Sequence, residues 1–113
     1  AVRNYNRCRY IKIEFQTNTE KVLIECLKSR QAKVRISAAM QLGQIGDADK
    51  ALLIAQITSQ DFPRYLDAWH LVASIYENRG EFQLAIPARK KTVELDPLNS
   101  VFRELLQKDI DSK

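Results

Sequence analysis

The side chains that could carry out chemistry are few in this sequence of 113 residues. It has one histidine, His70, and two cysteines, Cys8 and Cys26. Catalytic triads and zinc sites need several imidazoles, thiolates or carboxylates that converge on one point. No His or Cys lies near His70 in the sequence, and no carboxylate cluster has metal-ligand spacing around it. This pattern predicts neither a metal nor a nucleophilic site.

Two pairs of closely spaced carboxylates are the other candidates for acid–base chemistry. They are Asp47 with Asp49 and Asp109 with Asp111. Acidic residues are favoured at helix starts and in solvated tails, so we interpret both pairs as structural. Glycine-rich phosphate loops and serine nucleophile motifs are absent from the sequence. We therefore expect no catalytic residue and no cofactor, and expect this chain not to be an enzyme.

The two cysteines have a geometric relation if the N-terminal segment is a helical hairpin. Helices over 3–15 and 19–29 that turn near Thr17 would place Cys8 and Cys26 at the same height. They would then form a disulfide if their Cβ vectors agree, or remain two buried thiols. The sequence leaves both possibilities open.

Charge is unevenly distributed along the chain. Residues 1–40 carry a net charge of +6, and residues 41–113 carry −2. A basic end favours an acidic neighbour such as nucleic acid, an anionic lipid or an acidic protein, although a solvated helix face is the more common explanation. No apolar run reaches the ~20 residues of a membrane span.

The helices that would carry these residues are organised by an internal repeat. When the sequence is shifted against itself by about 34 residues, identical small or special residues superimpose. The matched pairs are Ala39 with Ala73, Gly46 with Gly80, Ala51 with Ala85, Thr58 with Thr92, and Pro63 with Pro97. Each unit is predicted to be a hairpin of two helices with a glycine between them. In the second unit we expect Asp67 to cap a helix over 68–79, and a second helix over 81–95.

The second unit resembles a tetratricopeptide repeat, a family whose period of about 34 residues equals the offset between the matched pairs. The matching residues are Ala68, Trp69, Ala73, Tyr76, Gly80, Ala85, Ile86 and the run Glu94-Leu95-Asp96-Pro97. Residues 66–99 follow the family pattern closely, and residues 32–65 are a degenerate copy with Arg35 at the usual aromatic position. Arg89 and Thr92 depart from the large-aromatic and alanine preferences of the family's second helix.

The resemblance implies an all-α fold, a right-handed α-α superhelix of about six to seven antiparallel helices. Residues 1–113 would form a single domain. Its parts would be an N-terminal helical hairpin over 1–31, a degenerate repeat over 32–65, a clear repeat over 66–99 and a capping helix over 100–113.

The resemblance also implies a concave groove lined by the first helix of each unit. The groove residues would be Lys33, Ile36, Met40, Gly43, Gln44, Asp67, His70, Ser74, Glu77 and Asn78. Some tetratricopeptide proteins clamp a partner's C-terminal carboxylate with Lys and Asn at such positions. Here Ile36 and Met40 occupy them, which favours an apolar or mixed ligand. His70 is either a groove contact or an ordinary solvent-facing residue.

A short basic run, Arg89-Lys90-Lys91, falls on the second helix of its unit and hence on the convex side. We interpret it as solvated surface. Nucleic-acid binding is disfavoured, because interleaved exposed aromatic residues are lacking: Trp69, Tyr76 and Phe82 fall on repeat-core positions.

A weaker resemblance is to the soluble C-terminal region of bacterial O-antigen ligase or polymerase membrane proteins. It is carried by Arg3, Tyr5, Arg9, Tyr10, Lys33-Val34-Arg35, the segment 38–42 and the segment 94–99. This parent would imply that glycan transfer takes place in a membrane portion outside this chain, with the basic segment near anionic lipid.

Two functions follow as predictions. The first is a non-catalytic scaffold module, part of a larger protein, that binds a protein or peptide in its concave groove. The alternative is an accessory soluble domain of a membrane-bound O-antigen ligase or polymerase. Either form is predicted to be cytoplasmic or membrane-tethered, with the cytoplasmic side favoured. Exposed ends of the solenoid would also allow a homodimer.

Overall fold

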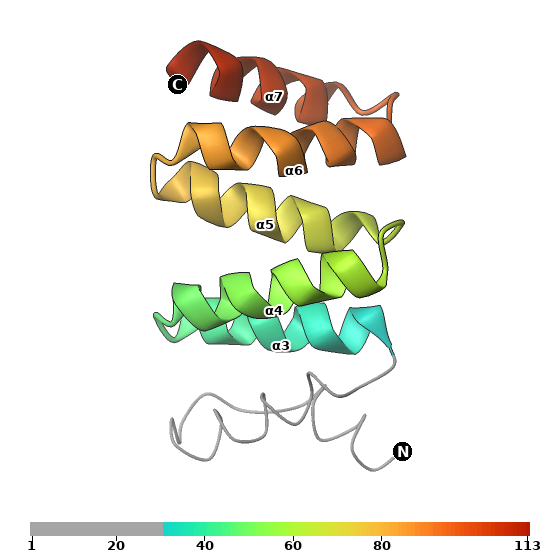
Figure 1. The fold of residues 1–113 in the computed structure, drawn as a ribbon, viewed down its shortest axis with the longest axis vertical. Helices are drawn as coiled ribbons and strands as arrows, with labels where there is room; N and C mark the ends of the chain where they lie inside the picture. Colours follow the sequence, from blue (N-terminus) through green and yellow to red (C-terminus); the bar gives the residue numbers. More distant parts are fainter. Residues whose placement is uncertain (1–30) are drawn as a thin grey trace.

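The computed structural model describes residues 31–113, and this part of the chain is helical with no strand. Five helices follow one another in a single stack (Figure 1). They are α3 (Ala32–Gln44), α4 (Ala48–Asp61), α5 (Leu66–Asn78), α6 (Phe82–Leu95) and α7 (Ser100–Ser112). The predicted hairpin over 1–31 and the relation between Cys8 and Cys26 lie outside the described residues.

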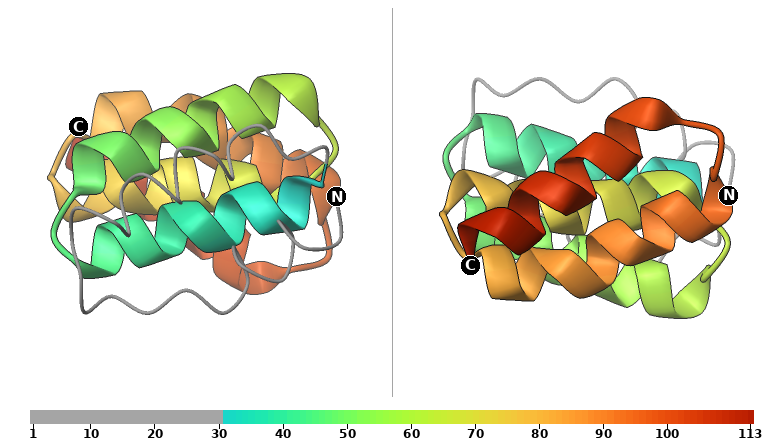
Figure 2. Two further views of the ribbon diagram at one scale, coloured as in Figure 1. Left: turned by 90° about the horizontal axis from the view of Figure 1, so that it is seen from below. Right: turned by 90° about the horizontal axis from the view of Figure 1, so that it is seen from above.

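The sequence repeat holds at every helix boundary. Helix α5 begins and ends exactly one repeat period after α3, and α6 does so after α4. Helix α7 stands in the same relation to α5, so it is the first helix of a third unit. Each helix runs antiparallel to the next, and views along the stack show successive helices crossing at an angle (Figure 2). The all-α repeat fold predicted from the sequence is confirmed.

Glycine ends the first helix of each hairpin in the same way. Gly46 and Gly80 have φ of 92° and 75°, in the left-handed region that side chains with a Cβ rarely adopt. In both turns the residue after the glycine donates its N–H to the carbonyl five positions earlier, at 2.9 Å. This arrangement satisfies carbonyls that a helix end otherwise leaves unpaired. The two glycines are therefore equivalent, as the repeat requires.

Alanine substitution should separate these turn glycines from Gly43, which lies inside α3. A Cβ at Gly43 would meet only the Cβ of Ala51, at 3.9 Å. We expect Gly43→Ala to raise the free energy of unfolding by about 0.5–1 kcal/mol, and Gly80→Ala to lower it by about 1–2 kcal/mol. Urea unfolding followed by circular dichroism measures both. Equal effects of the two substitutions would contradict the assigned turn geometry.

The core lies between the helices of each hairpin and between the two hairpins. Many of its members are alanines, and Ala38, Ala39, Ala73 and Ala85 are all fully buried. Larger side chains fill the remaining space, among them Leu42, which is 1% exposed. Side chains that are partly buried, such as Trp69 and Tyr76, cover the core at its edges.

The start of α5 differs from the sequence-based expectation. The helix begins at Leu66, with Tyr65 at the N-cap and no side-chain cap. Asp67 instead lies in the first turn and accepts a hydrogen bond from the Tyr65 hydroxyl at 3.3 Å. The prediction that Asp67 caps this helix is therefore wrong, because the helix starts two residues before the predicted Ala68. At the start of α7, Asn99 is the N-cap, and its side chain accepts hydrogen bonds from the N–H groups of Val101 and Phe102.

The degenerate aromatic position of the first unit is occupied by an ion pair. Arg35 donates to Asp61 at 2.6 Å, and its guanidinium lies 5.2 Å from the centre of the Phe62 ring. At the equivalent position of the second unit, the Trp69 indole donates to the carbonyl of Pro63. Both side chains thus tie the start of their helix to the α4 end and the turn that follows it. None of the helices within residues 31–113 combines the length and the apolar composition that a membrane-spanning segment requires.

Candidate functional site: a groove and a buried ion pair

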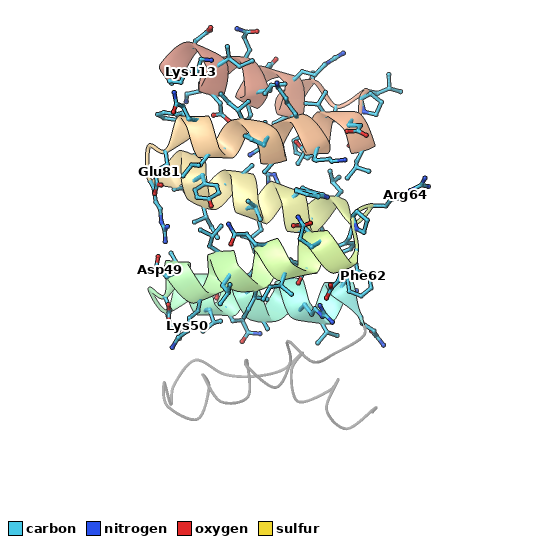
Figure 3. The ribbon with its side chains drawn as sticks, in the orientation of Figure 1. Asp49, Lys50, Phe62, Arg64, Glu81 and Lys113 are labelled. Atoms are coloured by element: carbon cyan, nitrogen blue, oxygen red, sulfur yellow. The ribbon has the colours of Figure 1, made fainter. Side chains whose placement is uncertain are left out.

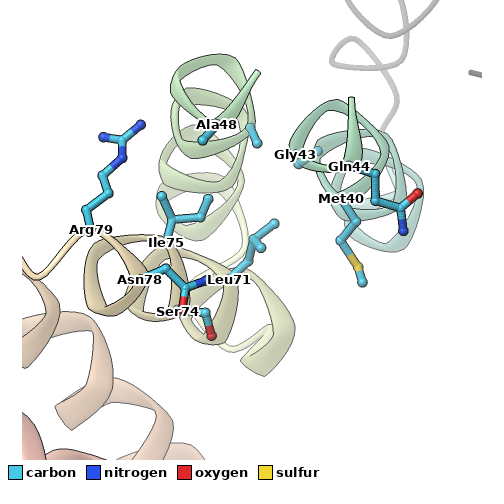
Figure 4. A pocket seen from close by; sticks show the side chains of 11 residues that line it. Met40, Gly43, Gln44, Ala48, Leu71, Ser74, Ile75, Asn78 and Arg79 are labelled. Atoms are coloured by element: carbon cyan, nitrogen blue, oxygen red, sulfur yellow. The ribbon is translucent and has the colours of Figure 1, made fainter. Parts of the chain in front are cut away.

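An open groove of about 370 Å³ lies between α3 and α5, with α4 beneath it (Figure 4). The residues that line it are Ala39, Met40, Gly43 and Gln44 of α3, Ala48 and Ala51 of α4, and Leu71, Ser74, Ile75, Asn78 and Arg79 at α5. On α5 the four helical residues follow the i, i+3, i+4, i+7 spacing that places side chains on one face. The groove is therefore built by one stripe of each wall helix.

The two walls present equivalent residues of the repeat to each other. Met40 and Gln44 on α3 correspond, one repeat later, to Ser74 and Asn78 on α5. Met40 is 52% exposed, and Gln44 and Asn78 are also accessible at the rim. The sequence-based prediction named these four as groove residues, together with Gly43, and the structure brings all of them to this groove.

Small residues keep the groove open, and apolar residues form most of its inner surface. Gly43 has no side chain, and Ala51 is a short one beneath it. Leu71 and Ile75 are partly buried and pack against the core of the first hairpin. The rim carries amides and a hydroxyl. This combination suits a ligand with an apolar side chain and hydrogen-bonding backbone groups.

An ion-pair bridge formed by a lining residue, Arg79, lies beside the groove. Arg79 donates to Asp49 on α4 and lies 3.9 Å from the carboxylate of Glu81. Asp49 and Glu81 lie along the same edge of the helix stack (Figure 3). The single cation among the groove-lining residues is thus engaged with carboxylates.

The other predicted groove residues lie elsewhere. Lys33 and Asp67 are exposed and do not line the groove. Ile36 is 4% exposed and packs with the core between the hairpins, so it offers no surface to a ligand. His70 and Glu77 also lie away from the groove, on the side of α5 that faces α7.

The basic run on α6 is split by the fold, and the expectation that all of it is solvated surface is wrong for Arg89. The Arg89 side chain is fully buried, whereas its neighbour Lys90 is exposed. Its Nε and Nη2 donate to the two carboxylate oxygens of Glu77, at 3.0 and 2.6 Å. Such a two-point pair is the usual way in which a buried guanidinium is compensated. Arg89 therefore points inward, toward α5 and α7.

His70 completes the environment of Arg89. Nη1 of Arg89 lies 2.9 Å from Nδ1 of His70, and a guanidinium has only donors, so Nδ1 must accept. The imidazole is then neutral, with its proton on Nε2. Burial first, and then the Arg89 charge, lower the pKa of His70, against opposing effects of Glu77 and Asp67. His70 is thus neither a groove contact nor an ordinary solvent-facing histidine.

Two residues of α7 pack on this cluster. The Phe102 ring lies 5.3 Å from the His70 ring and 5.7 Å from the Arg89 guanidinium carbon. One turn from the end of the helix, Asp109 is 1% exposed and meets Glu77. Burial, followed by the hydrogen bond and charge of Glu77, raises the pKa of Asp109 to about 7. Nothing in the sequence indicated this, since the carboxylate pair Asp109/Asp111 has the character of a solvated tail.

The two spaces between first helices are equivalent in the repeat but are filled differently. Gly43 and Ile75 line the α3–α5 groove and Ala55 is buried in the core, and one repeat later the corresponding positions hold Glu77, Asp109 and Arg89. Small and apolar residues thus leave the first space open as a groove. In the second, an ion pair and a carboxyl group occupy the corresponding positions.

Sequence reasoning did not include Leu71 and Ile75 in the groove. Their spacing from Ser74 and Asn78 along one helix stripe is the signal that would have found them. Within residues 31–113, no group of three His, Cys, Asp or Glu side chains is placed to hold a metal ion.

Comparison with known proteins relates the chain to a solved structure described as "MamA MSR-1 C2", a helical repeat protein of the tetratricopeptide type. The TM-score is 0.66 at 15% sequence identity, and the match covers 97% of this chain and 63% of that one. This chain therefore spans less than two thirds of that protein's length. At this identity the likeness establishes the fold alone.

No protein-family model matches the sequence, and no curated protein matches it. The relation to O-antigen ligases or polymerases finds no support in these comparisons and stays a prediction.

Proposed function

We propose that this chain is a non-catalytic protein-interaction module that binds a segment of a partner protein in the groove between α3 and α5. The observation that carries the proposal is the groove itself, an open hollow with an apolar interior, a rim of amides and a hydroxyl, and one cation, Arg79, that is already paired with carboxylates. Apolar surface that the fold leaves accessible between two helices is a common recognition site for peptide segments.

The chemistry of the rim indicates what kind of segment would fit. Gln44, Ser74 and Asn78 can donate to and accept from a peptide backbone. Arg79 is already paired with Asp49 and Glu81, so a terminal carboxylate would have to compete with two carboxylates for it. We therefore expect an internal segment that inserts an apolar side chain between Leu71 and Met40.

Selection from a random peptide library displayed on phage tests this function with a defined probe. Synthetic copies of the selected peptides should shift the amide NMR signals of Met40, Gln44, Ser74 and Asn78. The substitution Ser74→Arg places a long charged side chain in the groove and should weaken their binding at least tenfold, about 1.4 kcal/mol. Isothermal titration calorimetry measures the loss.

The matched control is Leu84→Arg, which introduces the same side chain at an exposed position of α6 outside the groove. It should leave the affinity unchanged. Peptides that bind Ser74→Arg as tightly as the unmodified chain, or that shift signals only on α6 and α7, would contradict the proposed site. The further predictions of a homodimer through the solenoid ends and of a membrane-associated parent rest on the sequence alone.

A further inference from the structure

Helix α7 carries a carboxyl group that is buried beside another carboxylate. Asp109 is 1% exposed, and its Oδ2 finds no hydrogen-bond donor among the described residues. Glu77, the group that it meets, is already held by two bonds from Arg89. An ionised Asp109 would therefore place a second negative charge against Glu77 in a largely buried site.

A protonated Asp109 resolves this conflict. A neutral carboxyl group has one O–H donor, and the Glu77 carboxylate is an acceptor within hydrogen-bonding reach. The hydrogen bonds of Arg89 go to Glu77 and His70, so the guanidinium gives Asp109 only its more distant positive charge.

We propose that Asp109, Glu77 and Arg89 form a proton-controlled latch, which holds α7 against α5 and α6 when Asp109 is protonated and loosens α7 when Asp109 ionises. The contacts between α7 and α5 include His70 with Phe102 near one end of α7 and Glu77 with Asp109 near the other. Of these two contacts, only the one between Glu77 and Asp109 gains a negative charge when Asp109 ionises. The latch is independent of what the groove between α3 and α5 binds.

The sign of the pH dependence follows from the proton count. Asp109 has a pKa of about 7 when α7 is docked and its usual 3.8 when the helix is released, so the docked form binds more protons in between. The stabilisation of the docked form by protonated Asp109 is therefore complete below pH 3.8, the pKa of Asp109 in the released form, and it weakens as the pH rises toward about 7. Above that pH both forms are ionised and the effect is constant.

The other charged groups around Asp109 affect the docking of α7 in different pH intervals. His70 on α5 has a lowered pKa, so acid below 6.5 favours the released form and opposes the Asp109 effect there. Glu77 has a pKa below its usual 4.5 and acts only in stronger acid. Arg89 stays charged throughout, and Lys108, on α7 itself, partly offsets the negative charge. The Asp109 effect must therefore be isolated by a variant.

Asp109→Asn is that variant, because an amide N–H₂ can donate to Glu77 as the protonated acid does but does not titrate. Amide hydrogen exchange in the full chain, corrected for the intrinsic rate at each pH, gives the opening equilibrium of α7. We divide the opening equilibrium constant of the unmodified chain by that of the Asp109→Asn variant. This ratio should rise by a factor on the order of 100 between about pH 5 and about pH 8. It should level off above about pH 7.

Asp111→Asn is the matched control, since it removes the same charge from an exposed position of the same helix. The opening equilibrium constant of the unmodified chain, divided by that of Asp111→Asn, should stay nearly constant with pH. A flat profile for Asp109→Asn would overturn the latch. So would equal changes in α3 and α7, because they would assign Asp109 to global stability and leave no local release.

A direct titration keeps the proposal testable even if Asp109→Asn fails to fold. The side-chain carboxyl carbon of Asp109, followed by NMR in the unmodified chain, should titrate near 7. A midpoint near the ordinary value of 3.8 in the folded chain would overturn the proposal.

Discussion

Replacing Arg89 by alanine is expected to lower the free energy of unfolding by about 3–5 kcal/mol, because it leaves the Glu77 carboxylate partly buried and without its partner. Three interactions are lost together, the two hydrogen bonds to Glu77 and the one to His70. The space left by the guanidinium also removes a contact of Phe102. Urea unfolding followed by circular dichroism gives the difference directly.

The adjacent residue supplies the control for Arg89→Ala. Lys90→Ala removes the same charge from the next position of the same helix, but Lys90 is exposed. We expect it to change stability by less than about 0.5 kcal/mol. If the two variants are equally stable, Arg89 lies on the surface and the cluster is wrongly assigned.

A double-mutant cycle would show how much of the Arg89 effect belongs to the ion pair. Removing Glu77 as well as Arg89 eliminates the uncompensated charge, so the double variant should be more stable than the sum of the two single changes implies. Strict additivity would mean that the two side chains do not interact.

Leu42→Ala is the second large effect, with an expected loss of about 2–5 kcal/mol. Leu42 is 1% exposed and lies in the apolar cluster between α3 and α4, where tightly packed alanines leave little room for relaxation. The loss contains both the lost burial of the side chain and the cavity that remains. Chemical unfolding of the full chain measures it.

Leu53→Ala makes the same chemical change at a position of α4 that is 54% exposed. It should cost less than about 0.5 kcal/mol, since no cavity forms at the surface. A loss at Leu53 as large as that at Leu42 would mean that the core runs along the other face of α4.

The buried ion pair gives the space between α5 and α7 a character that the α3–α5 groove lacks. Apolar residues that fill such a space are insensitive to pH, whereas a carboxyl group beside an ion pair titrates. The protein thus combines one accessible groove with one closed space at equivalent places of its repeat. Under the two proposals above, the groove binds a partner segment and the closed space controls where the last helix lies.

The repeat, its period and the turns between its helices could all be predicted from the sequence. A shift of one repeat aligned the turn glycines and the small residues, and these positions specify helix boundaries through local backbone conformation. Met40, Gln44, Ser74 and Asn78 were also predictable, because residues at equivalent repeat positions must lie on facing walls.

The environment of a side chain that several helices surround could not be predicted in this way, and it became visible only in the packed molecule. Arg89 belongs to a basic run and Asp109 to an acidic tail, and neither neighbourhood in the sequence contains the residue's partner. Glu77 is distant from Arg89 along the chain and meets it only when α5 packs on α6. Burial of a charge is a property of the packed helices around it, and residue spacing along one helix does not encode it.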